Sequence, residues 1–122
     1  MADSDLLDLI ARLGTGALQN ELATTSQATV ASLTPTTNGR FVVFASITVT
    51  TAATTVTLSC SWTDPQAGAQ SYTWENATNL PVGVRLELPL LIACQAGTAI
   101  QVLATAGTAN QVYVTADILR RG

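Results

Sequence analysis

Charged residues are scarce in this 122-residue chain, which contains no lysine and no histidine. Its five basic residues are all arginine, only 11% of its residues are charged, and its net charge is −3. An average globular domain carries about 25% charged residues. Histidine is the commonest general base and a common metal ligand, so its absence argues against acid–base catalysis and metal binding. Because nucleic-acid binding draws on many phosphate contacts, so few cations argue against it. We therefore expect no cofactor and no nucleic-acid partner.

Motifs that mark enzymes are also missing. The sequence contains no P-loop, GxGxxG, CxxC or GxSxG pattern. Three of the eight acidic residues lie within the first eight positions, and the other five are scattered. Asp64 and Glu75 fall in one expected hairpin, which is the only ground for considering them a glycosidase-like carboxylate pair. We therefore expect a protein that is not an enzyme.

Long apolar segments are absent as well. No apolar run reaches the roughly 20 residues that a membrane span needs, and the N-terminus lacks the charge and apolar core of a secretory signal. We expect a chain made in the cytosol, with no membrane partner. Its two cysteines, Cys60 and Cys94, are then expected to be free and buried. A disulfide stays open as an alternative, because both fall on inward faces of expected strands.

Alternation of apolar and polar residues dominates the chain from Gly39 onward. This period of two is typical of half-buried antiparallel strands. One face of a long strand is expected to hold Val84, Leu86, Leu88, Leu90, Ile92 and Cys94. Turn dipeptides separate the runs, among them Asn38-Gly39, Asp64-Pro65 and Ala96-Gly97. The pattern predicts an antiparallel β-sandwich over residues 39–122, of jelly-roll or tumour-necrosis-factor-like type.

Residues 1–38 have a different character and are expected to form a short α-helix followed by an extended arm. Ser4 can cap the helix and Gly14 can end it. A helix of about ten residues is marginal in water, so it must pack on its own domain, a sister subunit or another partner. Apolar residues in and after it are therefore the expected anchoring residues: Leu6, Leu7, Leu9, Ile10, Leu13, Leu18 and Leu22. The arm, Ala23–Asn38, is rich in Thr, Ser and Gln and is expected to hold one strand at Thr29–Leu33. It would either order on a partner or act as a flexible linker.

Aromatic residues are few, and three of them cluster in one expected hairpin. Trp62, Tyr72 and Trp74 flank the loop that contains Asp64-Pro65 and Ala67-Gly68. Exposed aromatic rings at a loop can stack on sugars, so these three residues are the candidate glycan contacts. The alternative is a cross-strand aromatic pair that packs on the core.

The strand region resembles a small β-sandwich domain found in tailed-bacteriophage virion proteins. The resemblance rests on the segments 38–43, 48–53, 62–64, 68–70, 96–100 and 112–116, and it extends from Asn38 to Leu119. Proteins of this kind include head decoration proteins, head fibres and tail-fibre tips, which commonly assemble as trimers. The resemblance implies a virion protein made in the host cytoplasm. The principal hypothesis is a homotrimeric decoration protein that binds the major capsid protein or another virion protein on the capsid surface and stabilises the head. The alternative is a fibre-tip or receptor-binding module for glycans.

Overall fold

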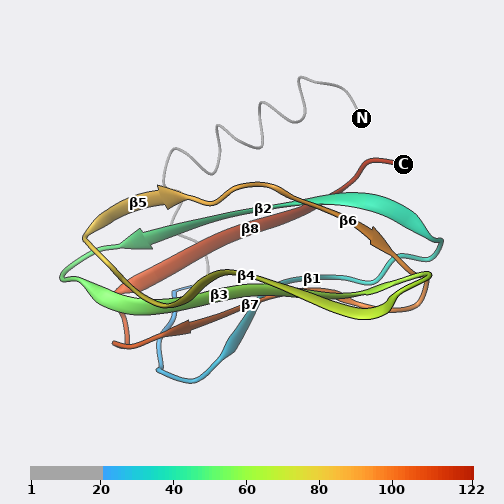
Figure 1. Ribbon diagram of the computed structural model, residues 1–122. Coiled ribbons are helices and arrows are strands. Elements are labelled where there is room, and N and C mark those ends of the chain that lie inside the picture. The colour runs from blue at the N-terminus through green and yellow to red at the C-terminus, as the bar shows by residue number, and fades with distance from the viewer. Residues whose placement is uncertain (1–20) are drawn as a thin grey trace.

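Eight antiparallel strands form two facing sheets in the computed structural model, which describes residues 21–122 (Figure 1). One sheet has the order β1 (Ala28–Leu33), β7 (Ile100–Ala106), β3 (Thr54–Asp64) and β4 (Gly68–Leu80). In the other sheet β2 (Gly39–Val49) is central, and β8 (Val112–Arg120) lies on one side of it. On the other side lie β5 (Gly83–Leu86) and β6 (Leu90–Cys94). The predicted antiparallel β-sandwich is thus confirmed, whereas the predicted N-terminal helix lies outside the described residues.

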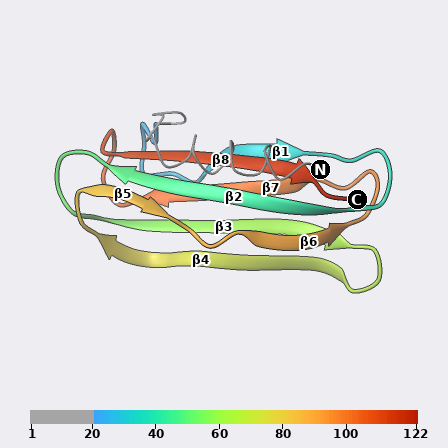
Figure 2. The same ribbon diagram turned by 90° about the horizontal axis from the view of Figure 1, so that it is seen from above.

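β5 and β6 together form one edge of the β2 sheet, and the pairing with β2 is interrupted between them. β5 pairs with the second half of β2 and β6 with the first half, so the two strands follow one another alongside β2 (Figure 2). Between them, the Glu87 N–H donates to the carbonyl of Ala45 at 3.0 Å. Pro89 follows and has no N–H to give. The ladder is therefore interrupted between Leu86 and Leu90.

This gap inverts the faces of β5 relative to the sequence prediction. Residues directly opposite each other in an antiparallel pair share a face, and Arg85 pairs with Ile47, a fully buried core residue. Ile92 pairs with Phe41, another core residue. Inward positions are thus odd-numbered in β5 and even-numbered in β6. The prediction of one shared face from Val84 to Cys94 is therefore wrong for Val84 and Leu86, which point away from the core. It is also wrong for Leu88, which lies in the gap and is 77% exposed.

The core lies between the sheets and is built from alternate strand residues. Its fully buried side chains include Ile47, Leu58, Ile100 and Val114. β2 departs from simple alternation because every residue from Phe41 to Ile47 is buried. Val42 and Phe44 point away from the main core and form a second apolar cluster with the partly buried Leu119. β2 therefore carries apolar side chains on both faces.

The segment expected as an arm contributes to the sandwich. β1 contains the expected strand Thr29–Leu33 and pairs with β7. Leu22, one of the expected anchoring residues, is buried in the main core. Its N–H donates to the carbonyl of Val112 at 2.8 Å, and its carbonyl accepts from Asn110 at 2.9 Å. Leu22 therefore fastens the chain to its own domain, at the beginning of β8.

Candidate assembly surface

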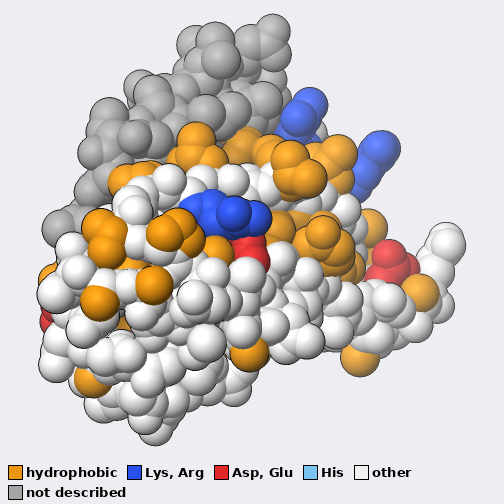
Figure 3. Space-filling view, turned by 60° about the vertical axis from the view of Figure 1, so that its left-hand side comes forward, with side chains coloured by type: hydrophobic (Ala, Val, Ile, Leu, Met, Phe, Trp, Pro, Cys, Tyr) orange, Lys and Arg blue, Asp and Glu red, His pale blue; other side chains and the backbone are white. Residues whose placement is uncertain are grey.

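Most of the exposed large hydrophobic side chains lie on or beside the β5–β6 edge. Five of the seven in the described chain fall within ten residues: Val82, Val84, Leu86, Leu88 and Leu91. We call these five residues the apolar strip. Leu88 and Leu91 are the most exposed, at 77% and 71%. Figure 3 shows hydrophobic side chains in several neighbouring groups on the face that it presents, with charged side chains between them.

The apolar strip continues across the outer face of the β2 sheet, the face turned away from the other sheet. Leu91 pairs with Val42, and Val42 pairs with Leu119 on β8. A row of three apolar side chains therefore crosses three strands. Antiparallel sheets that face water normally present polar residues on that side. Of these three side chains Leu91 is exposed at 71%, whereas Val42 is only 2% exposed.

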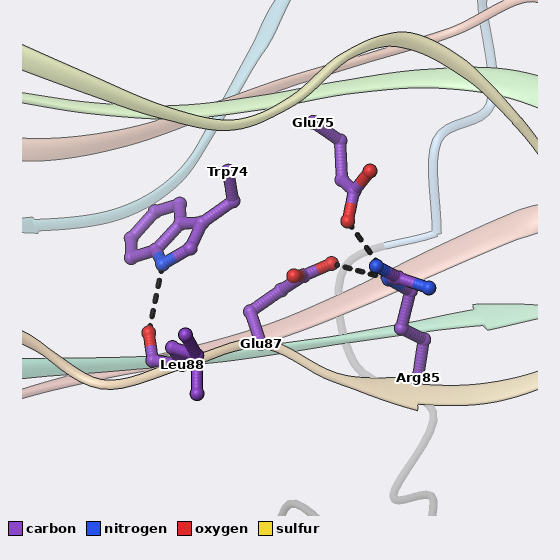
Figure 4. Close-up of polar contacts among 5 residues, drawn as sticks. All are labelled: Trp74, Glu75, Arg85, Glu87 and Leu88. Atoms are coloured by element: carbon purple, nitrogen blue, oxygen red, sulfur yellow. Dashed lines mark hydrogen bonds and ion pairs between the residues drawn. The ribbon is translucent and has the colours of Figure 1, made fainter.

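An ion cluster next to the strip connects the two sheets. Arg85 on β5 donates from Nε to Glu75 on β4 at 2.8 Å and to Glu87 at 3.2 Å (Figure 4). Both carboxylate side chains are nearly inaccessible, at 5% and 7%, whereas the Arg85 side chain is 55% exposed. One cation thus faces two buried acids at the open side of the sandwich.

The two acids of this cluster differ in their affinity for protons. Burial, together with the hydrogen bond and the charge of Glu75, raises the pKa of Glu87 to about 7, although Arg85 acts to lower it. Burial also acts on Glu75, but hydrogen bonds from Glu87, Thr78 and Arg85 outweigh it and lower the pKa of that carboxyl. Glu75 therefore keeps the negative charge, while Glu87 keeps a proton in mildly acidic solution and shares it with Glu75.

The three candidate glycan residues are not equivalent in the structure. Trp62 and Trp74 are half-buried and pack against the core. Trp74 also donates from its indole N–H to the carbonyl of Leu88 at 2.8 Å, a second link between the sheets (Figure 4). Tyr72 is the exposed member and meets Trp74 edge to face, with ring centroids 5.8 Å apart. A glycan-binding role for these residues stays a prediction.

Asp64 and Glu75 lie far apart on the β3–β4 hairpin. Glu75 pairs with Leu58, six residues before Asp64 on β3, which corresponds to roughly 20 Å along a strand. Paired glycosidase carboxylates lie about 5–9.5 Å apart. Asp64 accepts hydrogen bonds from the N–H groups of Ala67 and Gln66, which lower its pKa. Its observed role is to fix the turn between the two strands.

Cys60 and Cys94 are both buried, and neither forms a disulfide. Burial, assisted by the neighbouring Cys94, raises the pKa of Cys60 to about 12. The Cys94 thiol lies near the carbonyls of Gln95 and Thr98. Neither cysteine is therefore placed as a surface nucleophile.

The burial of Cys60 leads us to predict slow reaction of its thiol in the native chain. At pH 8 Cys60 of the native chain should react with the disulfide reagent DTNB roughly a thousandfold more slowly than a free thiol, since so high a pKa suppresses its thiolate. Absorbance at the thionitrobenzoate wavelength follows the reaction, and the chain unfolded in urea serves as the fast control. Rapid reaction of two thiols in the native chain would contradict the prediction.

Other site types find little support in the described part of the chain. Residues 21–122 contain no group of three or more possible metal ligands. No helix within those residues has the length and apolar character needed to cross a membrane.

A hollow of about 570 Å³ lies at the C-terminal end of β8, between Arg40 and Arg121, with Leu91 and Ala93 in its wall.

No family model and no curated protein sequence matches the chain. Among solved structures, it is similar to the infectious bursal disease virus Gx strain structure, with a TM-score of 0.51 and 13% identity over 82% of this chain. It is also similar to the VP2 subviral particle of that virus, with a TM-score of 0.50 and 9% identity over 82% of this chain. The chain spans only 28% of the length of either matched chain. At such low identity, what the chain shares with these viral proteins is the fold.

Proposed function

We propose that this chain is a structural virion protein, most specifically a decoration protein of a tailed-bacteriophage head that binds the outer shell as a homotrimer. The observation that carries the proposal is the apolar strip, whose five side chains are exposed in the described chain. The similarity of fold to viral particle proteins supports a virion role. The major capsid protein is the proposed partner, and no enzymatic activity is proposed.

The strip suits a permanent neighbour better than free solution. Leu88 and Leu91 are more than two-thirds exposed, so covering each with a partner would remove substantial apolar area from water. Such burial contributes about 25 cal/mol per Å². The few charges of the chain add little desolvation cost around it. Contacts of this kind form only in the assembled particle, so by mass action they stabilise the particle relative to its separate parts.

Two measurements test the proposal. Light scattering during size-exclusion chromatography should give the purified chain three times its 12.6 kDa mass. Added to heads of the encoding virus assembled without it, the chain should bind and raise the temperature at which they break. A monomer would contradict the trimer. Heads that neither bind the chain nor gain heat resistance would contradict decoration.

A pair of variants shows whether the strip makes the contact. Replacing Leu88 and Leu91 together by serine should reduce head binding at least tenfold, because both side chains are exposed and lie on the strip. The matched control is Leu33→Ser on β1, an exposed leucine in the other sheet. We expect this control to bind as the wild type does. Equal loss in both variants would show that the strip is not the specific contact.

A further inference from the structure

The centre of the outer face of the β2 sheet is apolar, and the N-terminal residues of the same chain have apolar side chains that could cover it. Val42 and Phe44 are only 2% and 3% exposed, although they point away from the main core. Within residues 21–122, the hydrophobic residue packed against this pair is Leu119. A sheet face with this character normally packs against another layer of structure.

The first described residue, Glu21, lies beside the strand that borders this same face. Glu21 forms a β-bridge with Tyr113 near the beginning of β8, and its carboxylate accepts a hydrogen bond from the Tyr113 hydroxyl. The described chain therefore begins at the β8 edge of the β2 sheet. Tyr113 and Leu119 are six residues apart on β8, or roughly 20 Å. The seven residues 14–20 can span about 23 Å when extended, so Leu13 can reach the Leu119 cluster.

The chemistry of the N-terminal residues fits the face. The expected helix has an apolar side, with Leu6, Leu9 and Ile10 among its members, that matches Val42, Phe44 and Leu119. The same segment of sequence contains three aspartates, at positions 3, 5 and 8. The hollow at the far end of the face is lined by Arg40 and Arg121. Apolar residues would thus meet apolar residues, and acids would approach the two arginines.

We propose that residues 5–13 dock in cis on the outer face, across Val42, Phe44 and Leu119, with the aspartates directed toward Arg40 and Arg121. This arrangement covers the centre of the face and leaves the apolar strip at its β5–β6 edge for other molecules. It therefore separates an intramolecular layer from the surface proposed for assembly. The inference does not depend on the virion role.

A spin label near the N-terminus tests the docking in the full-length chain. We would introduce Ala2→Cys, attach a nitroxide and record amide spectra of the ¹⁵N-labelled protein. Amides near Val42, Phe44 and Arg121 should lose most of their intensity, while those of Ser71 and Thr73 on the opposite sheet should not. The wild type, treated with the same reagent, controls for reaction at the two buried cysteines.

A mixed sample distinguishes the chain's own segment from that of a second copy. Here ¹⁵N-labelled wild type is combined with unlabelled, nitroxide-bearing Ala2→Cys chain. Docking in cis predicts no loss of intensity on the outer face of the ¹⁵N-labelled chain. Loss in this sample would place a neighbour's segment on the face and overturn the proposal. An unaffected outer face in both samples would overturn it too.

A variant in the N-terminal segment checks that apolar contact drives the docking. Leu9→Asp combined with Ile10→Asp changes residues outside the sandwich, so the eight strands should still form. In the nitroxide-bearing chain this double change should restore the intensity of the Val42 and Phe44 amides. The matched control is Ala11→Asp, which adds one charge without removing a large apolar side chain. Unchanged broadening in the double variant would contradict apolar docking.

Discussion

Replacing Glu87 by glutamine should make the chain more stable than the wild type at pH 8, by about 2–3 kcal/mol. Glutamine resembles the protonated glutamic acid, which is the form that the site favours. The Glu87 side chain is only 7% exposed and shares Arg85 with the buried Glu75, so a second negative charge there is costly. A glutamine N–H can still donate to the Glu75 carboxylate.

The sign of the wild-type pH dependence follows from the same site. Burial raises the pKa of Glu87 from an ordinary 4.5 to about 7, so the folded chain holds a proton that the unfolded chain releases. Stability from this group is complete below about pH 4.5 and is lost as pH rises to about 7. The lowered pKa values of Glu75 and Asp64 act in the opposite sense, at pH values below their ordinary range. Stability should therefore be greatest near pH 5 and decline toward neutrality.

Urea unfolding between pH 4.5 and 8 measures this effect. The wild type should lose free energy of unfolding across that range, and Glu87→Gln should show a much flatter profile. Asp64→Asn is the control: it keeps an oxygen that can accept the two turn hydrogen bonds, removes the charge, and should leave the slope above pH 4.5 unchanged. A wild-type profile that is flat or rises between pH 5 and 7 would refute the assignment of the proton to Glu87.

Replacing Arg85 by leucine should lower the free energy of unfolding at pH 7 by about 2 kcal/mol. Removing one partner of a fully buried ion pair costs about 3–5 kcal/mol, because the other charge stays buried. Arg85 is 55% exposed, so water screens part of its interaction and reduces the expected effect. The loss should remain substantial because Glu75, at 5% exposure, would have no cation beside it.

Two further variants separate charge from geometry at this position. Arg85→Lys keeps the charge but loses the planar guanidinium that faces both carboxylates, so it should recover only part of the stability. Adding Glu75→Gln to Arg85→Leu removes the unpaired charge and should restore much of the loss. If Arg85→Leu unfolds at the same urea concentration as the wild type, the cluster does not stabilise the fold.

The strand pattern of the sandwich was predictable from local sequence, because the period-two alternation of β3, β7 and β8 directly reflects one buried face. Leu58 and Cys60 on β3 and Val112 and Val114 on β8 are buried as that alternation requires. The interruption at Glu87–Pro89 was the exception. An added residue between paired segments exchanges the faces of a strand, and the pattern of apolar residues alone does not register it.

The candidate surface was harder to predict, for a related reason. Val84, Leu86 and Leu88 of the apolar strip were predicted on the buried face because they alternate in step with Leu90, Ile92 and Cys94. The pairing of Leu86 with Ser46 and the exposure of Leu88 show that they do not belong to it. The ion cluster joins Glu75 and Arg85 from different sheets, a contact that depends on how the sheets are stacked.

The broken line of β5 and β6 limits how two copies of this chain can meet. A continuous edge strand invites another strand to add to it, and many proteins prevent this with lysine, which this chain lacks. Here the gap at Leu86–Leu90 leaves no uninterrupted row of backbone groups, and Pro89 withholds one donor. On β4, Ala77 at φ 49° and two changes of pairing register disturb the ladder in the same way. An exposed row of apolar side chains can thus coexist with resistance to strand addition at these two edges.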